Sequence, residues 1–225
     1  MIREQLKEAK KACRFMQNVK PEVKNKALKN ISEALIQKSE LIIQENQKDI
    51  AEAKNNGIKE SMVDRLLLNK ERIEAMAKDI LKVIDLQDPI GTLEIKRPNG
   101  LVIQQIRIPL GVIGVIYESR PNVTVDIASL CIKTNNVCVL KGGKEAIHSN
   151  RILVQIINEA IQDVLPTHTV TLIETKKREE ILDLIQAHDY VDVIIPRGSA
   201  GLIQYVVKNA TVPVIETGAG ICHLY

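Results

Sequence analysis

The spacing of apolar residues divides the chain into a helical part and a part with alternating patterns. From Ile2 to about Ile84, apolar side chains recur three or four positions apart, which is the period of an amphipathic helix. Pro21 suits the first turn of a helix, Asn55-Asn56-Gly57 marks a stop, and Ser61 can cap a further short turn. Residues 1–86 are therefore predicted to be helical, with their lysines and glutamates on a solvated face.

The pattern changes after Asp88 to turn formers and residues that favour strands. Pro98-Asn99-Gly100 separates a short run, Leu93 to Lys96, from a longer one, Leu101 to Ile108. Two such runs around a turn predict a β-hairpin over residues 91–108. Such an arm is expected to extend a sheet into a neighbouring subunit, and the alternative is a simple edge strand of the same domain.

Short apolar runs alternate with helical patterns from Pro109 to the end of the chain. The runs with the length and composition of buried strands are Val112 to Tyr117, Val137 to Leu140, Val170 to Ile173, Val191 to Ile195 and Val212 to Ile215. The helical patterns between them include Ile152 to Val164, Glu179 to Ala187 and Leu202 to Val207. This alternation predicts an α/β fold, in which the helical N-terminal segment is followed by a Rossmann-like doubly wound parallel sheet over residues 109–225.

Two loops of this second part combine cations with small residues. Glu118 to Asn122 follows the first predicted strand, Lys141 to Lys144 follows the second, and each loop is expected to pass into a helix. Parallel strands end at one edge of a sheet, where helix N-termini attract anions. The pattern favours a phosphate-bearing ligand, above all a nucleotide, and the alternative is an ordinary crossover with solvated lysines. No G-x-G-x-x-G follows any strand, so a dinucleotide would be bound by a variant fingerprint.

Composition and charge argue against several kinds of partner and site. The net charge is only +3, and aromatic residues make up 2% of the chain, which argues against nucleic acid as a partner. The sequence contains neither a signal peptide nor an apolar run that could cross a bilayer, so a cytoplasmic protein without membrane contact is expected. Its cysteines form no C-x-x-C pair and its histidines show no metal-ligand spacing, and we predict no metal.

Four segments together resemble the γ-glutamyl phosphate reductase family, also called glutamate-5-semialdehyde dehydrogenases, of the aldehyde dehydrogenase superfamily. These segments are Asp64 to Leu66, Pro109 to Asn150 with its YESRPN and GGKEA motifs, Asp192 to Ser199, and Val214 to Tyr225. The resemblance implies an aldehyde dehydrogenase type of fold and the NADPH-dependent reduction of L-glutamyl 5-phosphate to L-glutamate 5-semialdehyde in proline biosynthesis. In such enzymes a cysteine thiolate attacks the acyl phosphate, and hydride reduces the resulting thioester. A reductase of another acyl substrate from the same superfamily is the alternative.

The resemblance also implies a set of cofactor-binding residues. They are Lys141, Gly142, Gly143, Lys144, Arg197, Gly198 and Ser199. The two lysines match positions that contact the adenosine ribose, and a lysine at 144 would attract a 2′-phosphate, so NADP is expected. Gly198 and Ser199 match a turn that faces the pyrophosphate from a helix N-terminus. Lys141 replaces an arginine associated with the family and gives up bidentate geometry, and a solvated surface role is the alternative for both lysines.

The remaining site residues are implied in the same way. Asn122 resembles the asparagine whose amide holds the oxyanion, and Glu216 lies where many aldehyde dehydrogenases place a general base. Ser119 and Arg120 are expected to meet the phosphate or carboxylate of the substrate. For Glu216 the alternative is a structural role, capping backbone N–H groups after the fifth strand.

The family continues beyond the point that corresponds to Tyr225, and the resemblance implies that its nucleophilic cysteine lies there. Cys222 matches a family cysteine that is not the nucleophile, and His223 would point to the opposite face of an extended strand. Residues 1–225 are thus expected to be an NADP-binding domain without the catalytic domain, and the full-length protein is expected to be a homo-oligomer. The alternative is an inactive fragment that binds a nucleotide or a partner chain.

Overall fold

The computed structural model describes residues 2–174 and 179–216, and its first part is helical as predicted. The helices are α1 (Ile2–Met16), α2 (Pro21–Gln37), α3 (Ser39–Asn55), α4 (Glu60–Leu66) and α5 (Lys70–Asp85). Pro21 is the first residue of α2, where its missing N–H leaves no hydrogen bond unmade. Asn69 caps α5, because its Oδ1 accepts a hydrogen bond of 2.9 Å from the backbone N–H of Arg72. None of the described helices has both the length and the apolar character to cross a membrane.

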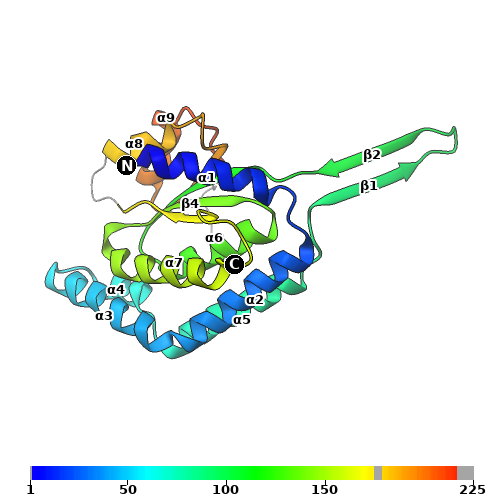
Figure 1. The fold of residues 1–225 in the computed structure, drawn as a ribbon. Helices are drawn as coiled ribbons and strands as arrows, with labels where there is room; N and C mark the ends of the chain where they lie inside the picture. The colour runs from blue at the N-terminus through cyan, green and yellow to red at the C-terminus, as the bar shows by residue number, and fades with distance from the viewer. Residues whose placement is uncertain (1, 175–178, 217–225) are drawn as a thin grey trace, which may run out of the picture.

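The predicted hairpin is a two-stranded antiparallel arm. Its strands are β1 (Gly91–Lys96) and β2 (Val102–Arg107), with Gly91 opposite Arg107 and Lys96 opposite Val102. Every residue of both strands is exposed, and Figure 1 shows the arm extending away from the body of the molecule. Within the described residues neither strand pairs with the main sheet, so the alternative of an edge strand is wrong.

The second part of the chain builds a parallel sheet. Its strands are β3 (Val112–Tyr117), β4 (Val137–Lys141), β5 (Val170–Leu172) and β6 (Val193–Arg197), in the order β5-β4-β3-β6 with every neighbouring pair parallel. All residues of β3 and β4 are buried. Burial on both faces explains why these strands are continuous apolar runs rather than alternating ones.

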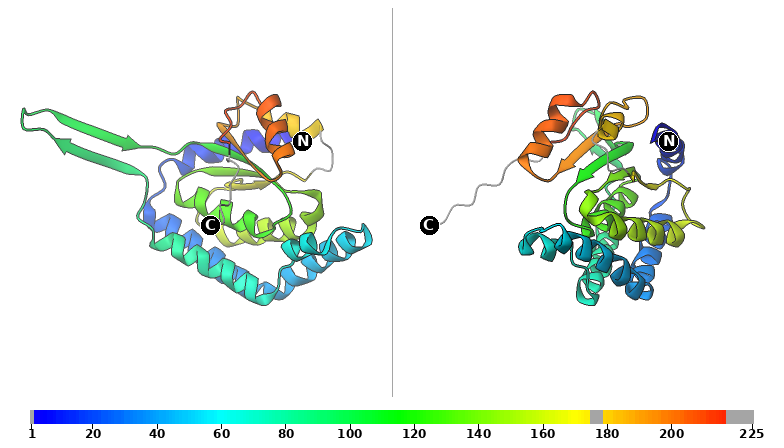
Figure 2. Two further views of the ribbon diagram at one scale, coloured as in Figure 1. Left: turned by 180° about the vertical axis from the view of Figure 1, so that it is seen from behind. Right: turned by 90° about the vertical axis from the view of Figure 1, so that its left-hand side faces the viewer.

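Helices cover both faces of the sheet, which confirms the Rossmann-like doubly wound architecture. They are α6 (Asn122–Lys133), a short 3₁₀ turn η1 (Lys144–Ala146), α7 (Ile147–Ile161), α8 (Glu179–Ile185) and α9 (Ala200–Asn209). One face is covered by α6 and α7, with α2, α3 and α5 packed outside them (Figure 1). The opposite face carries α1, α8 and α9, as the views of Figure 2 also show. One hydrophobic core runs through these layers.

The prediction of a full fifth strand over Val212 to Ile215 is wrong. The described residues contain only one parallel bridge there, between Val214 and Ile194. Around it, Ile194 donates its N–H to the carbonyl of Pro213 at 2.8 Å and accepts one from Ile215 at 2.9 Å. Proline has no N–H to continue the ladder, which limits this segment to a single bridge at the sheet edge. Cys222 and His223 lie outside the described residues.

The predicted cap of α4 is also wrong. Ser61 does not cap α4, because the helix begins one residue earlier at Glu60 and Lys59 takes the capping position. Helix α7 begins at Ile147, which confirms the helix expected after Lys144 and lies five residues before the apolar pattern that starts at Ile152. Asp49 of α3 accepts the backbone N–H groups of His148 at 3.1 Å and of Ser149 at 2.8 Å. A carboxylate from a helix far away in the sequence thus completes the first turn of α7.

Candidate nucleotide site at the carboxyl edge of the sheet

The strand order places a topological switch point between β3 and β6. From β3 the chain moves to β4 and β5 on one side, and it later returns to β6 on the other side. Loops that leave such a point in opposite directions open a crevice at the carboxyl ends of the strands, where ligands of doubly wound sheets bind. The loops at this edge are 118–121 after β3, 142–143 after β4 and 198–199 after β6. The fold therefore brings the three predicted loops to one edge.

The loop after β6 presents the N-terminus of α9. Ser199 is the capping residue, and its Oγ accepts a hydrogen bond of 3.4 Å from the N–H of Leu202. The N–H of Ser199 itself donates to Oε2 of Glu118 at 2.8 Å, and its hydroxyl donates to Oε1 of Glu118 at 3.4 Å. A carboxylate thus sits where the helix dipole favours negative charge. The carboxylate also lies close to Gly198, since an added Cβ there would be 2.5 Å from Oε2 of Glu118.

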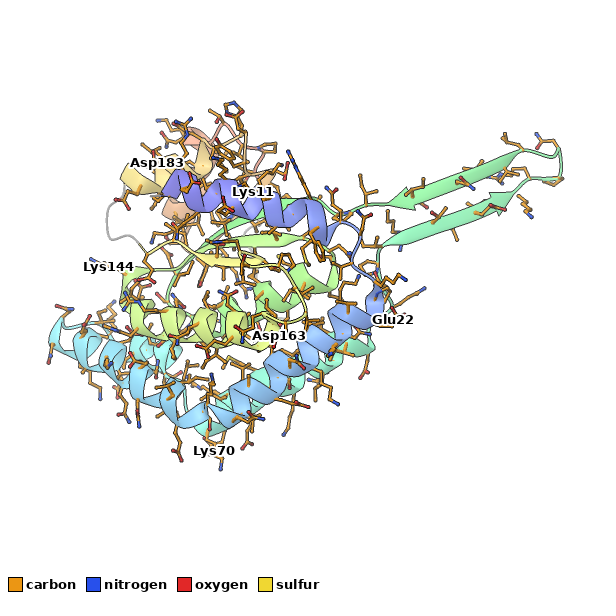
Figure 3. The ribbon with its side chains drawn as sticks, in the orientation of Figure 1. Lys11, Glu22, Lys70, Lys144, Asp163 and Asp183 are labelled. Carbon is orange, nitrogen blue, oxygen red and sulfur yellow. The ribbon has the colours of Figure 1, made fainter. Side chains whose placement is uncertain are left out.

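Two lysines flank the loop after β4, and one of them is buried while the other is exposed. Lys141 is 8% exposed, and its Nζ donates to the carbonyl of Gly142 at 2.7 Å. Burial lowers the pKa of Lys141, while the carboxylates of Glu145 and Glu180 oppose that effect. A Cβ at Gly142 would lie only 2.1 Å from Nδ2 of Asn150, so glycine is required. Lys144 is exposed and begins η1, and Figure 3 shows it at the end of the molecule opposite the arm.

The loop after β3 is tied to its neighbour by Glu145. Ser119 has a positive φ of 53°, which is uncommon for a residue with a side chain. Its N–H and Oγ both donate to Oε1 of Glu145, at 2.8 Å and 3.0 Å, and these bonds hold the turn in place. Arg120 beside it is exposed. Glu145 therefore joins the loops after β3 and β4, just as Glu118 joins the loops after β3 and β6.

A third carboxylate, that of Asp126, is influenced by two predicted site residues, Asn122 through a hydrogen bond and Arg197 through its charge. Asn122 begins α6, and its Nδ2 donates to Oδ2 of Asp126 at 3.2 Å. Burial raises the pKa of Asp126, while the positive charge of Arg197 and the Asn122 hydrogen bond act in the opposite direction. Glu216 is exposed beyond the sheet edge. Among the described residues, no hydrogen bond or ion pair joins it to the other predicted site residues.

Glu118, Asp126 and Glu145 are the residues that the sequence analysis did not single out. Each uses its carboxylate to hold a predicted site residue. A local signal was available for Glu145, because an acid directly after Gly-Gly-Lys and before a helical pattern suits the first turn of a helix. Glu118 could have been noticed as a charged residue directly at the end of a buried strand.

A cavity of about 890 Å³ lies between α1, the end of β5 and α8. Its lining includes Gln5, Glu174 and Asp183, and none of the predicted site residues contributes to it. This cavity is therefore distinct from the three loops described above.

Comparison with known proteins agrees with this geometry. A model of the aldehyde dehydrogenase family matches residues 1–219. The γ-glutamyl phosphate reductase of Anoxybacillus flavithermus is 49% identical over 222 residues, which cover 97% of this chain and 54% of that protein. The one from a Geobacillus species is 50% identical over 225 residues, covering 99% and 54%. The chain thus spans about half the length of the curated relatives it matches.

Solved structures give the same result. The γ-glutamyl phosphate reductase of Thermotoga maritima superposes with a TM-score of 0.92 at 42% identity, covering 96% of this chain and 53% of that one. The enzyme of Saccharomyces cerevisiae gives 0.85 at 33% identity, with coverages of 94% and 55%. A probable aldehyde dehydrogenase of Listeria monocytogenes shares the fold at 19% identity, with a TM-score of 0.77 and coverages of 97% and 46%. The resemblance inferred from the sequence is confirmed.

Proposed function

This chain belongs to the aldehyde dehydrogenase family, and we propose that it supplies the nucleotide-binding part of an NADPH-dependent γ-glutamyl phosphate reductase. The reaction is the reduction of L-glutamyl 5-phosphate to L-glutamate 5-semialdehyde with release of phosphate, in proline biosynthesis in the cytoplasm. The relatives of this name support the substrate class. The observation that carries the proposal is the convergence of three loops at the switch point of the parallel sheet.

The residues at this edge fit a dinucleotide phosphate. Two glycines, Gly142 and Gly198, keep the backbone surface free of side chains at positions where a Cβ would meet neighbouring atoms at 2.1 Å and 2.5 Å. The N-terminus of α9 offers backbone N–H groups for a pyrophosphate, and Lys141 and Lys144 supply positive charge. When bound, the cofactor would supply the hydride. The residues of this chain hold and orient it.

The choice of NADPH over NADH rests on Lys144 and Glu145. An NAD site commonly uses an acid to bind the ribose hydroxyls. The acid available here, Glu145, already accepts two hydrogen bonds from Ser119. Lys144 is exposed beside it and can pair with a 2′-phosphate. The arrangement therefore favours the phosphorylated cofactor.

The loop after β3 would serve the substrate. Arg120 is exposed and would pair with the phosphate or carboxylate, beside Ser119. The amide of Asn122 would donate to the oxyanion, after exchanging its present bond to Asp126. Glu216 would act as the general base. The nucleophilic cysteine belongs to the part of the relatives that this chain does not span.

The arm of β1 and β2 is proposed to contact a second subunit of a homo-oligomer. Both strands are exposed along their whole length, and a two-stranded ribbon alone is marginally stable in water. Pairing with a neighbouring subunit would satisfy its free edges and cover its apolar side chains.

Calorimetric titration of the 225-residue chain with NADPH and NADH tests the cofactor proposal. We expect NADPH to bind more tightly, and Lys144→Glu to weaken NADPH at least about tenfold, because a hydrogen bond to a charged group is worth roughly 1.5–3 kcal/mol. Lys70→Glu is the matched control, since Lys70 is exposed on α5 at a distance from the site (Figure 3). A folded chain that binds neither nucleotide, or a preference that Lys144→Glu leaves unchanged, would contradict the proposal.

A further inference from the structure

We propose that Glu118 lowers the affinity of the nucleotide site by occupying, in the ligand-free chain, the place that a nucleotide phosphate takes at the N-terminus of α9. This inference rests on the proposed function and adds a residue to it. It concerns a side chain that positions and competes with the ligand, and Glu118 is given no part in the chemistry.

The contacts of Glu118 coincide with those expected for the pyrophosphate. Its Oε2 accepts the N–H of Ser199 at 2.8 Å, and its Oε1 lies 3.4 Å from the hydroxyl of the same residue. The same carboxylate lies against Gly198, where an added Cβ would be 2.5 Å from Oε2. The backbone N–H of Glu118 is bonded to the carbonyl of Arg197 at 3.3 Å, so the two loops are adjacent at the backbone as well. The carboxylate occupies both the N–H of Ser199 and the space beside Gly198, which the phosphate would need. A carboxylate and a phosphate cannot occupy this position at the same time.

Glu118 is also free to leave this position. Its side chain is exposed, and among the described residues no cation forms an ion pair with it. The contrast with Glu145 is instructive, because Glu145 is half-buried and holds Ser119 in its left-handed conformation. Rotation of Glu118 towards solvent would cost only its bonds to Ser199, whereas removal of Glu145 would release a strained turn.

The consequence is that every anion binds more weakly at the N-terminus of α9, and a small anion has no further contacts that would make up for this cost. Inorganic phosphate or pyrophosphate would have to displace the carboxylate with the contacts at α9 alone. A dinucleotide makes additional contacts at the loop after β4, including Lys144, and these offset the displacement. The cost of displacing Glu118 is the same for both ligands, so it lowers both affinities and leaves their ratio unchanged.

The test compares Glu118→Gln and Glu118→Ala with the unchanged chain. We expect both variants to bind NADPH about two- to fivefold more tightly, the range that corresponds to an anion at an exposed helix N-terminus. Glu71→Gln, an exposed glutamate in the first turn of α5, is the control and should bind as the unchanged chain does. Circular dichroism verifies that each variant is folded.

A second measurement does not depend on NADPH. Titration with inorganic pyrophosphate, followed through the amide resonance of Ser199, should shift that resonance in both Glu118 variants at concentrations about two- to fivefold lower than in the unchanged chain. Equal or weaker NADPH binding by the variants would overturn the inference while leaving the proposed function intact. If no form binds NADPH, the proposed function fails, and the inference fails as well unless both variants bind pyrophosphate more tightly than the unchanged chain does.

Discussion

The arm and the main sheet are built from similar strand-forming residues and lie in opposite environments. In β3, the sequence VIGVIY is buried at every position, whereas VIQQIR in β2 is exposed at every position. The main sheet is stabilised by helices on both faces, and the arm has no such cover within the described residues. A strand-forming composition therefore does not by itself show that a strand is buried. In this chain the central strands of the main sheet are buried, and the strands of the arm are exposed.

The register of the arm shows where its exposed apolar side chains lie. Ile95 lies opposite Ile103, so that these side chains and Leu93 project from one face of the ribbon, while Val102 and Ile106 project from the other face together with Glu94 and Gln104. Leu93 is 52% exposed. An apolar face of this kind is typical of a contact surface, which agrees with the proposed contact to a second subunit.

The largest expected difference separates a core leucine from an arm isoleucine. Leu140 of β4 is fully buried, so Leu140→Ala should lower the free energy of unfolding by about 2–5 kcal/mol. Ile103→Ala in the arm should change it by less than about 0.5 kcal/mol while the chain is monomeric. Urea unfolding monitored by circular dichroism measures both. Equal losses would show that the arm is buried in solution and would contradict the comparison.

The base of the arm should respond more strongly than its strands. Lys24 of α2 is buried, and its Nζ contacts Oδ2 of Asp88 at 2.6 Å, Oδ1 of Asn135 at 2.5 Å and the carbonyl of Lys133 at 3.0 Å. Lys24→Ala should lower the free energy of unfolding by about 2–3 kcal/mol. Breaking a buried ion pair typically costs about 3–5 kcal/mol, and the loss is smaller here because Asp88 retains some contact with water. A double-mutant cycle with Asp88→Asn measures the coupling. Additive losses would show that the ion pair does not fasten the arm to the helical layer.

The strands of the core could be predicted because burial on both faces requires continuous apolar runs, which are visible in the sequence. Val112 to Tyr117 matches β3 in full, and Val137 to Leu140 misses only the last residue of β4. The hydrogen bonds that join the loops produce no such local pattern, because their partners lie far apart in the sequence. Glu118 and Ser199 are 81 positions apart, and Ser119 and Glu145 are 26 positions apart.

The first turn of α7, which precedes the apolar pattern from Ile152, is stabilised by an equally distant partner. Asp49 lies about a hundred positions before the N–H groups that it accepts, so no window around His148 contains the cap. The single bridge at Val214 shows a different cause, because proline overrides the apolar pattern of its neighbours. Predictions failed where tertiary contacts or backbone chemistry competed with local periodicity.

A smaller difference in stability is expected between the loss of a polar contact in the core and the loss of one in the arm. The hydroxyls of Tyr117 and Thr124 lie 2.6 Å apart in the core, and Thr124 also donates to Oδ1 of Asn150 at 2.9 Å. Tyr117→Phe should cost about 1–2 kcal/mol, because a buried polar group loses its partner. Gln104→Ala removes an exposed contact of 3.3 Å to Glu94 in the arm and should cost less than about 0.5 kcal/mol. Thermal unfolding of both variants gives the comparison, which equal costs would contradict.

The smallest effect concerns the dependence of stability on pH in the packed region. Burial raises the pKa of Asp49 above its ordinary value of 3.8, although hydrogen bonds from Ser149 and His148 oppose the shift. Between 3.8 and the raised value the folded state binds more protons than the unfolded state, so this carboxyl makes the protein less stable as the pH rises through that window. Asp49→Asn cannot ionise and should lack this decline, even though it loses one acceptor oxygen at the start of α7. The measurement is the urea midpoint from about pH 4 to about pH 7, with Asp163→Asn as the control because Asp163 is exposed just beyond the other end of α7 (Figure 3). A stability difference between the unchanged chain and Asp49→Asn that stays constant over this range would show that Asp49 titrates alike in both states.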